Sequence, residues 1–251
     1  MAHIRTAICF CAGMGTRMRP YTYHAPKSLL PLAGRSLLAR HVDALAASGV
    51  RRIIVNAHYM AEKVEYHVKS LRRRFPALSF VYVREEGEAA LETGGGVVNA
   101  LPHIDDAHFY AVNADALFPP NAYVRELRRL RDARIFFDED DAHALLLQPI
   151  GRQYGYAGKG DFSFSEGARI YLSKGEKTPC YVFSGMQLLS RHYFTDKPRD
   201  VWSLKSLYRD PAQRLYGVVS RSAPWLHVGD PAALAQAERY VRRLTFKEKL
   251  N

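Results

Sequence analysis

The feature that most constrains the fold is a glycine-bearing loop directly after a short apolar run near the N-terminus. Residues Thr6–Cys11 are apolar after the first position, and Gly13 and Gly15 follow almost at once. A short apolar run that ends in glycines is typical of a buried strand followed by a tight turn. Glycines also let backbone N–H groups approach a phosphate closely. This part of the sequence therefore predicts a strand that ends in a phosphate-binding loop.

Strand-like and helix-like segments alternate after this loop. The apolar positions from Leu37 to Ala46 recur at helical spacing until Gly49 ends the pattern. Further strands are predicted at Arg52–Asn56, Ser79–Val83 and Ala107–Val112, and further helices at Tyr59–Phe75, Val97–Leu101 and Ala122–Leu130. Such alternation implies right-handed crossovers and a predominantly parallel sheet flanked by helices. We expect a Rossmann-like α/β fold.

The second half of the sequence has a different pattern. After about Ala144 the predicted strands are shorter and glycine-rich turns such as Gly155–Gly160 separate them. Nothing resembles a linker or an internal repeat, and 251 residues with 47% apolar side chains can share one core. We therefore expect a single domain over residues 1–251, with a smaller β-rich part in its second half that holds a second substrate.

The charge and the cysteines limit the partners and the compartment. The formal net charge is +11, which favours polyanions in general. The basic runs, such as Arg72–Arg74 and Arg128–Arg129, fall in predicted helices without interleaved aromatic residues, so solvated helix faces are favoured over nucleic-acid binding. Cys9, Cys11 and Cys180 form no CxxC pair, which favours buried reduced thiols and a cytoplasmic protein. No segment predicts a membrane span or a secretory signal.

The loop differs from two common phosphate-binding motifs. Met18 stands where a dinucleotide-binding GxGxxG turn has its third glycine, and a GxxxxGK[ST] sequence is absent. Instead, the loop is long, bounded by prolines, and carries Arg17 and Lys27. Two cations beside a glycine loop favour a site for a nucleoside triphosphate.

The loop resembles the opening motif of the nucleoside-diphosphate-sugar pyrophosphorylases, also called sugar-1-phosphate nucleotidyltransferases. The family pattern is roughly LAAGxGxRxxPxTxxxPKxxxPxxG. This chain has FCAGMGTRMRPYT from Phe10 to Thr22, and then Pro26-Lys27, Pro31 and Gly34 at matching spacing. Cys11 replaces the usual alanine, and its small side chain implies little consequence.

The resemblance covers nearly the whole chain. Its further segments are Leu91–Gly96 at the base-reading loop, Asn113–Asp115 at a strand-end metal site, Phe183–Met186 at the sugar pocket, and Trp225–Gly229 at the late WxDxG segment. The Leu91–Gly96 loop and Gly158–Phe162 are most similar to the short branch of N-acetylmuramate-1-phosphate uridylyltransferases, which act in cell-wall recycling.

The resemblance implies transfer of a nucleotide to a sugar 1-phosphate, with release of pyrophosphate. Arg17 and Lys27 are the implied catalytic residues, and Asp115 and His227 the implied metal ligands. The implied nucleotide-binding residues are Ala12, Gly13, Met14, Gly15, Thr93, Gly94 and Asn113, although Asn113 can equally brace the loop. The implied sugar-binding residues are Asp161, Glu176 and Gly185. For Asp115 and Asp161 the alternative is an ordinary turn residue.

His227 is the main departure from the family pattern, because the late WxDxG segment normally supplies a second carboxylate to Mg²⁺. Imidazole suits Mn, Co, Ni or Zn better than Mg²⁺. His227 is expected to ligate the metal weakly, to contact the phosphates, or to leave Asp115 acting alone. We expect Mg²⁺ as the cofactor, with Mn²⁺ as the alternative ion.

The first substrate pair is UTP with N-acetylmuramate 1-phosphate. One alternative is GTP with mannose 1-phosphate or another hexose or heptose phosphate, and another is a nucleotide-sugar-binding subunit without turnover. We expect a monomer or a small homo-oligomer that binds no nucleic acid and no membrane.

Overall fold

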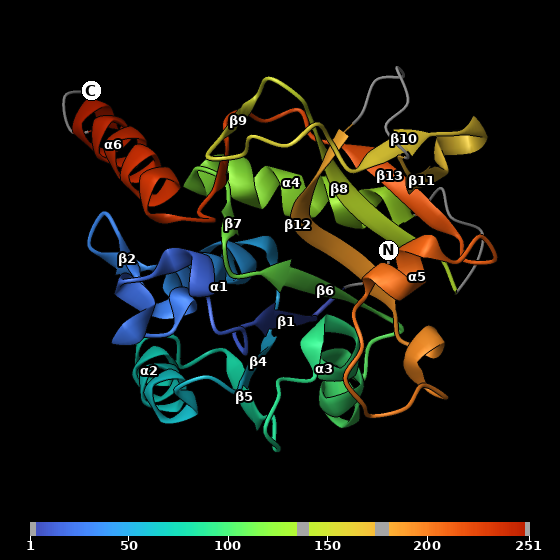
Figure 1. The fold of residues 1–251 in the computed structure, drawn as a ribbon, viewed down its shortest axis with the longest axis horizontal. Coiled ribbons are helices and arrows are strands. Elements are labelled where there is room, and N and C mark those ends of the chain that lie inside the picture. The colour runs from blue at the N-terminus through green and yellow to red at the C-terminus, as the bar shows by residue number, and fades with distance from the viewer. Residues whose placement is uncertain (1–3, 135–140, 174–180, 249–251) are drawn as a thin grey trace.

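The computed structural model describes residues 4–134, 141–173 and 181–248, and it centres on one twisted sheet (Figure 1). Its first half is parallel, in the order β5 (Ser79–Arg84), β4 (Arg52–Ala57), β1 (Thr6–Phe10) and β6 (His108–Asn113). In the register of these strands, Ile8 of β1 lies between Ile54 of β4 and Ala111 of β6. From β1 the chain adds β4 and β5 on one side and then crosses to add β6 on the other, so the strand order reverses between β1 and β6 and their ends form a topological switch point.

The second half of the sheet is mainly antiparallel. The long strand β12 (Tyr181–Ser190) runs antiparallel to β6 and then pairs with two groups of strands. One group is β8 (His143–Pro149) with β13 (Leu215–Val219), and the other is β10 (Phe162–Phe164) with β11 (Ile170–Leu172). The register along β12 shifts between Phe183 and Gln187, where Gly185 has a φ of 79°.

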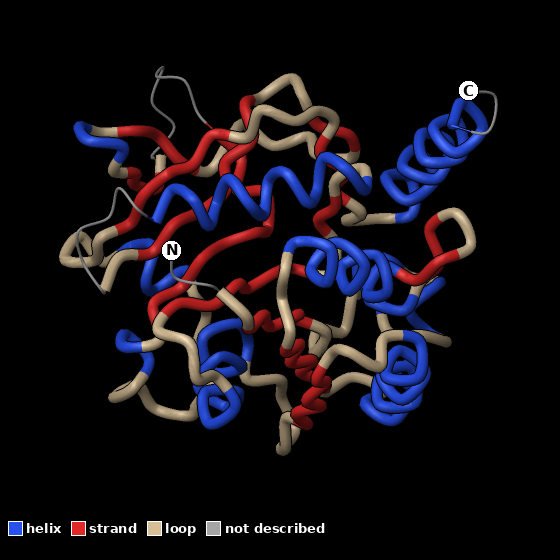
Figure 2. Tube along the Cα trace, turned by 180° about the vertical axis from the view of Figure 1, so that it is seen from behind, coloured by secondary structure: helices blue, strands red, loops and turns tan. Residues whose placement is uncertain are grey.

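Two apolar cores cover the two faces of the sheet, and Figure 2 shows the helices on either side. Alternate residues of β1 point to opposite faces: Ala7 and Cys9 belong to one core, and Ile8 belongs to the other. The first core includes α1 (Leu37–Ser48), α2 (Ala61–Arg74), α4 (Pro120–Ala133) and α6 (Pro231–Glu248). The second includes α3 (Glu92–Ala100) and α5 (Lys205–Arg209).

Two small sheets complete the structure. The hairpin β2 (Pro31–Leu32) and β3 (Arg35–Ser36) precedes α1. A separate sheet joins β7 (Ala116–Leu117), β14 (Trp225–His227) and β9 (Gln153–Tyr154). Because β7 directly follows β6 and pairs with β14, this sheet brings the late part of the chain to the end of β6.

The Rossmann-like fold and the core strands predicted from the sequence are confirmed. Gly49 ends α1 with a φ of 106°, as its position predicts. Cys9 and Cys11 are buried free thiols, and burial raises the pKa of both; Cys180 lies outside the described residues. The prediction for Leu91–Gly96 was wrong in form, because α3 begins at Glu92 and the three glycines are helical.

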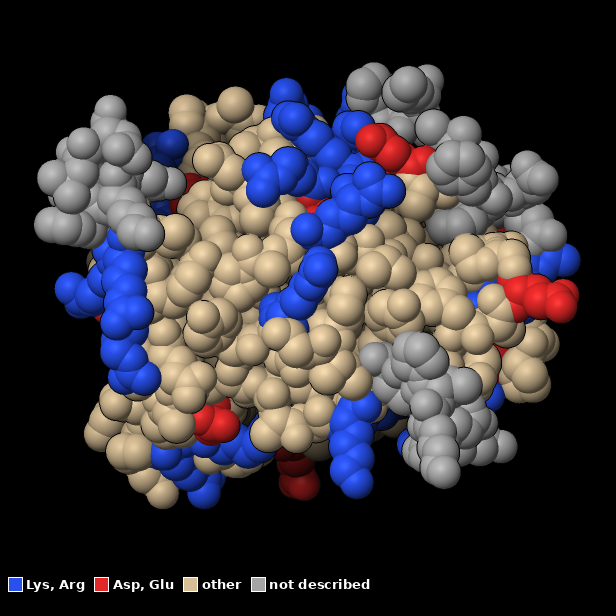
Figure 3. Space-filling view, turned by 90° about the horizontal axis from the view of Figure 1, so that it is seen from above, with Lys and Arg blue, Asp and Glu red and all other residues tan. Residues whose placement is uncertain are grey.

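The basic runs lie on the outer faces of helices. Arg72, Arg73 and Arg74 are exposed in the last turn of α2, and Arg128 is exposed on α4. Figure 3 shows Lys and Arg side chains in several separate groups on the face seen from above. None of the described helices combines the length and the apolar character needed to cross a bilayer.

Candidate active site

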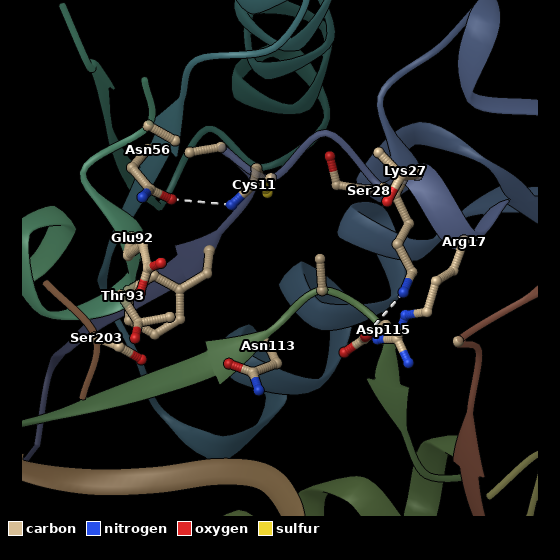
Figure 4. A pocket seen from close by; sticks show the side chains of 18 residues that line it. Cys11, Arg17, Lys27, Ser28, Asn56, Glu92, Thr93, Asn113, Asp115 and Ser203 are labelled. Carbon is tan, nitrogen blue, oxygen red and sulfur yellow. Dashed lines mark hydrogen bonds and ion pairs between the residues drawn. The ribbon is translucent and has the colours of Figure 1, made fainter. Parts of the chain in front are cut away.

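Two cavities meet where β1 and β6 end. The first, of about 460 Å³, is lined by the glycine loop, Lys27, Asn56 and the start of α3. The second, of about 500 Å³, lies over β10 and β12. Arg17, Asn113 and Asp115 line both. In Figure 4, Arg17, Lys27 and Asp115 lie at one end of the first cavity, and Glu92, Thr93 and Ser203 lie at the other.

The two glycines of the loop have different structural roles. Gly15 has a φ of 61°, and a Cβ atom there would lie 3.0 Å from Cβ of Lys27. The carbonyl of Gly15 accepts a hydrogen bond from the Thr22 hydroxyl (2.9 Å), which holds the loop against the next turn. A Cβ atom at Gly13 would meet nothing, so its position is open toward the cavity. Met14 is 52% exposed and is absent from the lining, whereas Ala12, Gly13 and Gly15 belong to it.

Lys27 and Asp115 form an ion pair at the junction of the cavities. Nζ of Lys27 lies 2.7 Å from Oδ2 of Asp115, and both side chains are largely buried. Burial alone would raise the pKa of Asp115, but the charge and hydrogen bond of Lys27, together with the nearby His227, lower it below its ordinary value. Asp115 is therefore ionised. The neighbouring Arg17, by contrast, forms no ion pair with any of the residues described.

A buried polar network links the glycine loop to α3. The N–H of Cys11 donates to Oδ1 of Asn56 (2.9 Å), and the Asn56 amide donates to Oε1 of Glu85 (2.6 Å). The other Glu85 oxygen accepts from the N–H of Leu91 (2.8 Å), next to the start of α3. A Cβ atom at Gly96 would lie 2.9 Å from both the Asn56 amide and the Glu85 carboxylate, so glycine leaves room for this network.

The other two helical glycines let the segment 200–204 pack against α3. A Cβ atom at Gly94 would lie 2.2 Å from the Trp202 ring, and one at Gly95 would lie 1.9 Å from the carbonyl oxygen of Asp200. The N–H groups of Gly94 and Gly95 both donate to the Trp202 carbonyl. Gly94 is therefore turned away from the cavity and is absent from its lining, unlike the predicted base contact. Thr93 lines the cavity and accepts a hydrogen bond from the N–H of Leu204 (3.0 Å).

The pairing of β14 with β7 brings His227 to Asp115. Nε2 of His227 lies 3.9 Å from Oδ2 of Asp115. The Nδ1–H of the ring donates to the Gly155 carbonyl (3.1 Å), which directs Nε2 to the carboxylate side. A Cβ atom at Gly229 would lie 2.5 Å from the ring, so glycine is needed for this ring position.

Asp115 and His227 fit a divalent ion that is held mostly by its other ligands. They supply one carboxylate and one imidazole whose second nitrogen is hydrogen-bonded to a carbonyl, as is usual for a ligating histidine. Within residues 4–134, 141–173 and 181–248, no cluster of three His, Cys, Asp or Glu side chains could hold a metal. An ion here would need phosphate oxygens or water to complete its shell, which is common for Mg²⁺ bound with phosphates.

A buried pair behind β6 orients the peptide that carries Asp115. The Nε2–H of His41 donates to the Ala114 carbonyl (3.2 Å), and Nδ1 accepts from the Tyr123 hydroxyl. The ring is fully buried, and burial lowers the pKa of His41 to about 4. His41 is therefore neutral at neutral pH, and each of its two nitrogens has one defined partner.

Aromatic side chains form much of the second cavity. The rings of Phe162, Phe183 and Tyr208 pack edge to face with centroids 5.8 to 6.5 Å apart. Asp161 and Gly185 also line this cavity, and Oδ2 of Asp161 accepts from the N–H of Phe183 (2.9 Å). Glu176, the third predicted sugar contact, lies outside the described residues.

Several lining residues were not among the predicted site residues. They include Ser28, Asn56, Glu92 and Ser203 in the first cavity, and Tyr156, Lys205, Tyr208 and Arg209 in the second. Asn56 had a usable signal, because it ends a predicted strand at the edge where ligands bind. Ser203, Lys205 and Arg209 had none, since only the packing of segment 200–204 on α3 brings them there.

The profile of the MobA-like NTP transferase domain matches residues 7–169, which include the glycine loop, Lys27 and Asp115. The chain belongs to this family.

Two curated relatives extend the similarity across the enzyme. The chain is 31% identical over 238 residues to the N-acetylmuramate alpha-1-phosphate uridylyltransferase of Caulobacter vibrioides, and the match covers 93% of this chain and 96% of the relative. It is 32% identical over 241 residues to the mannose-1-phosphate guanylyltransferase of Mycobacterium tuberculosis, covering 91% of this chain and 62% of that protein.

Solved structures agree on the fold. The inositol-1-phosphate CTP transferase of T. maritima superposes with a TM-score of 0.74 at 17% identity, covering 95% of this chain and 96% of that one. HddC from Yersinia pseudotuberculosis gives 0.70 at 21% identity, covering 94% and 99%. The family and the full-length relative make the enzyme a sugar-1-phosphate nucleotidyltransferase, as the sequence predicted.

Proposed function

We propose that the enzyme joins UTP to N-acetylmuramate 1-phosphate, giving UDP-N-acetylmuramate and pyrophosphate, in the recycling of cell-wall material. The observation that carries this proposal is the pair of cavities that share Arg17, Asn113 and Asp115. Two substrates that react with each other need adjoining sites with the charged groups at their junction. The similarity to the Caulobacter uridylyltransferase over almost the full chain supports this substrate pair.

In the proposed reaction an oxygen of the sugar phosphate attacks the α-phosphorus of UTP, and the bond from that phosphorus to the β-phosphate oxygen breaks. The protein aligns the two phosphates and neutralises their charge. The backbone from Ala12 to Gly15 holds the triphosphate, and Arg17 binds the β- and γ-phosphates and the leaving pyrophosphate. Lys27 leaves Asp115 to bridge the α-phosphate and the incoming phosphate, since its ammonium group has a flexible stem.

Other lining residues orient the two substrates. Thr93 and Asn113 contact the nucleoside, with the base beside the first turn of α3. Asp161 contacts the sugar, and Gly185 leaves space beside Asn113, because a Cβ atom there would lie 3.2 Å from Cβ of Asn113. Gly94 acts by holding segment 200–204 in place through its N–H.

Asp115 and His227 would hold the divalent ion. When bound, that ion neutralises phosphate charge and fixes the phosphates in line. The imidazole of His227 favours Mn²⁺ over Mg²⁺ relative to a site with two carboxylates. His227 also depends on Gly155 and Gly229 for its tautomer and position.

A second substrate pair, GTP with mannose 1-phosphate, is favoured by the similarity to the Mycobacterium guanylyltransferase over 91% of the chain. Pyrophosphate release should be measured with UTP, GTP, CTP and dTTP against N-acetylmuramate, N-acetylglucosamine and mannose 1-phosphates, with Mg²⁺ and with Mn²⁺. We expect the fastest release with UTP and N-acetylmuramate 1-phosphate. Faster release with GTP and mannose 1-phosphate would overturn the first pair, and thermal stabilisation by ligands without release would indicate a binding subunit.

The same proposal places the enzyme in the cytoplasm, where UTP is available. The buried free thiols of Cys9 and Cys11 support this location, because such thiols persist in a reducing compartment. Fractionation of the producing cells would test it, with recovery in a periplasmic or membrane fraction as the contrary result.

A further inference from the structure

The second cavity contains two cations that the proposed nucleotidyl transfer does not require. Lys205 and Arg209 are exposed, line this cavity and are four residues apart on α5, so they lie on the same face of the helix. In the proposed reaction, Arg17 and Lys27 already serve the phosphates. Neither the Lys205 nor the Arg209 side chain has an ion pair with any residue in the described part of the chain.

The position of α5 is fixed by packing on both sides. The Tyr208 ring packs against Phe162 (5.8 Å) and Phe183 (5.9 Å), and its hydroxyl donates to Oε1 of Gln187 (2.7 Å). At the start of the helix, the N–H of Leu204 donates to the hydroxyl of Thr93. The two cations therefore extend from a fixed helix into the cavity.

The helix contacts β11, which is not a neighbour of the strand that leads to Asp115. Asp115 follows β6, and the strands from there run in the order β12, β10 and β11, with α5 against β11. Three strand spacings separate β6 from β11, about 14 Å. Asp115, Lys205 and Arg209 line the same cavity, so a sugar whose phosphate lies at Asp115 can extend across it to the two cations.

Among the described residues that line the cavity, no carboxylate forms an ion pair with Lys205 or Arg209. Its described carboxylates are Asp115, which is paired with Lys27, and Asp161, whose Oδ2 accepts from a backbone N–H. Two cations facing an apolar, aromatic floor are suited to an anionic group on the substrate.

We propose that Lys205 and Arg209 bind a second acidic group of the sugar phosphate, a carboxylate that projects away from its phosphate. This inference rests on the proposed function and names the part of the protein that selects among sugars. N-acetylmuramate 1-phosphate has such a carboxylate on its lactyl ether, whereas N-acetylglucosamine 1-phosphate is the same sugar without it. Mannose 1-phosphate also lacks it.

The test compares kcat/KM for N-acetylmuramate and N-acetylglucosamine 1-phosphates at saturating UTP. The variants are Lys205→Gln, Arg209→Gln and the double variant. The double variant Lys197→Gln/Arg199→Gln is the matched control, since it removes two exposed cations that do not line the cavity. Circular dichroism and thermal melting of each variant establish that it is folded.

We expect the native protein to prefer the muramate substrate and the Lys205/Arg209 double variant to lose about tenfold of that preference, the scale of a lost charge-assisted hydrogen bond. The loss should appear in KM for the muramate substrate, with KM for UTP unchanged. The control variant should keep the full preference, which excludes a general effect of net charge.

Three results would overturn the inference. Equal use of the two sugars by the native protein would show that no carboxylate is read, while the nucleotidyl transfer of the proposed function would stand. A preference that the double variant retains would place the carboxylate elsewhere. Absence of pyrophosphate release with every sugar 1-phosphate would overturn the proposed function, and the inference with it.

Discussion

The two cavities are built from different kinds of sequence information. Most of the cationic end of the first cavity comes from one continuous stretch, residues 10–28, together with Asp115 at the end of β6. The second cavity shares Arg17 with the first but collects its other residues from widely separated parts of the chain between Asn113 and His227. The first is held by the end of a parallel strand, and the second by antiparallel strands and a five-residue helix. A local motif thus provides phosphate chemistry, and long-range packing decides which second substrate reaches it.

The largest expected effect is the loss of a cation at the junction. Replacement of Arg17 by alanine should lower kcat by about 10²–10³, because one preorganised partner of the developing phosphate charge is removed. Pyrophosphate release under saturating substrates measures this. Arg19→Ala is the matched control, since Arg19 lies over the Tyr23 ring (5.1 Å) and lines neither cavity. An equal loss in both variants would contradict a specific role for Arg17.

The helical glycines provide a sharper contrast with the loop glycines. Gly95→Ala should lower the free energy of unfolding by about 3 kcal/mol or more, because its Cβ atom would overlap the Asp200 carbonyl and force apart α3 and segment 200–204. Gly13→Ala should leave the melting temperature unchanged, since a Cβ atom there meets nothing in the protein. It should raise KM for UTP, because the added methyl group enters the space of the triphosphate. Thermal melts and UTP titrations separate the two. A stable Gly95→Ala protein would show that the segment does not pack this closely.

Acid should destabilise both halves of the molecule through one buried histidine in each. Burial lowers the pKa of His41, behind the first cavity, to about 4, and burial with the neighbouring His108 lowers the pKa of His143, on β8, to about 3. Below pH 6.5 these two histidines bind protons in the unfolded chain but not in the folded protein, so the free energy of unfolding falls as the pH falls. At pH 5 each should cost about 2 kcal/mol relative to pH 7.5.

Urea unfolding at pH 7.5 and pH 5 measures this loss. His41→Gln and His143→Gln should each remove about half of the difference between the two pH values, whatever they do to stability at pH 7.5. If neither variant changes that difference, the acid sensitivity comes from other groups.

A smaller effect is expected at His227, the proposed metal ligand that departs from the family pattern. His227→Asp should raise activity with Mg²⁺ and lower the ratio of Mn²⁺-supported to Mg²⁺-supported activity, roughly tenfold. Binding of Mn²⁺ measured by electron paramagnetic resonance gives a readout besides activity. Equal Mg²⁺ dependence in the native protein and the variant would show that His227 is not a ligand.

The sequence determined the chemistry of the first cavity and the class of fold. Apolar strands that alternate with amphipathic helices leave few ways to bury their apolar faces, so the Rossmann-like sheet follows from the pattern. Arg17, Lys27 and the glycine loop are near neighbours in the chain, and the end of a parallel strand places Asp115 beside them.

Only the tertiary structure decided the rest. The predicted base loop is a helix whose start is held by a residue far along the chain: the Trp202 carbonyl accepts hydrogen bonds from the N–H groups of Gly94 and Gly95, and the Trp202 ring packs on Gly94. His227 faces Asp115 because β14 pairs with β7, and Lys205 and Arg209 reach the second cavity because Tyr208 is anchored among Phe162, Phe183 and Gln187. These contacts join residues more than twenty positions apart, and no local preference of the chain encodes them.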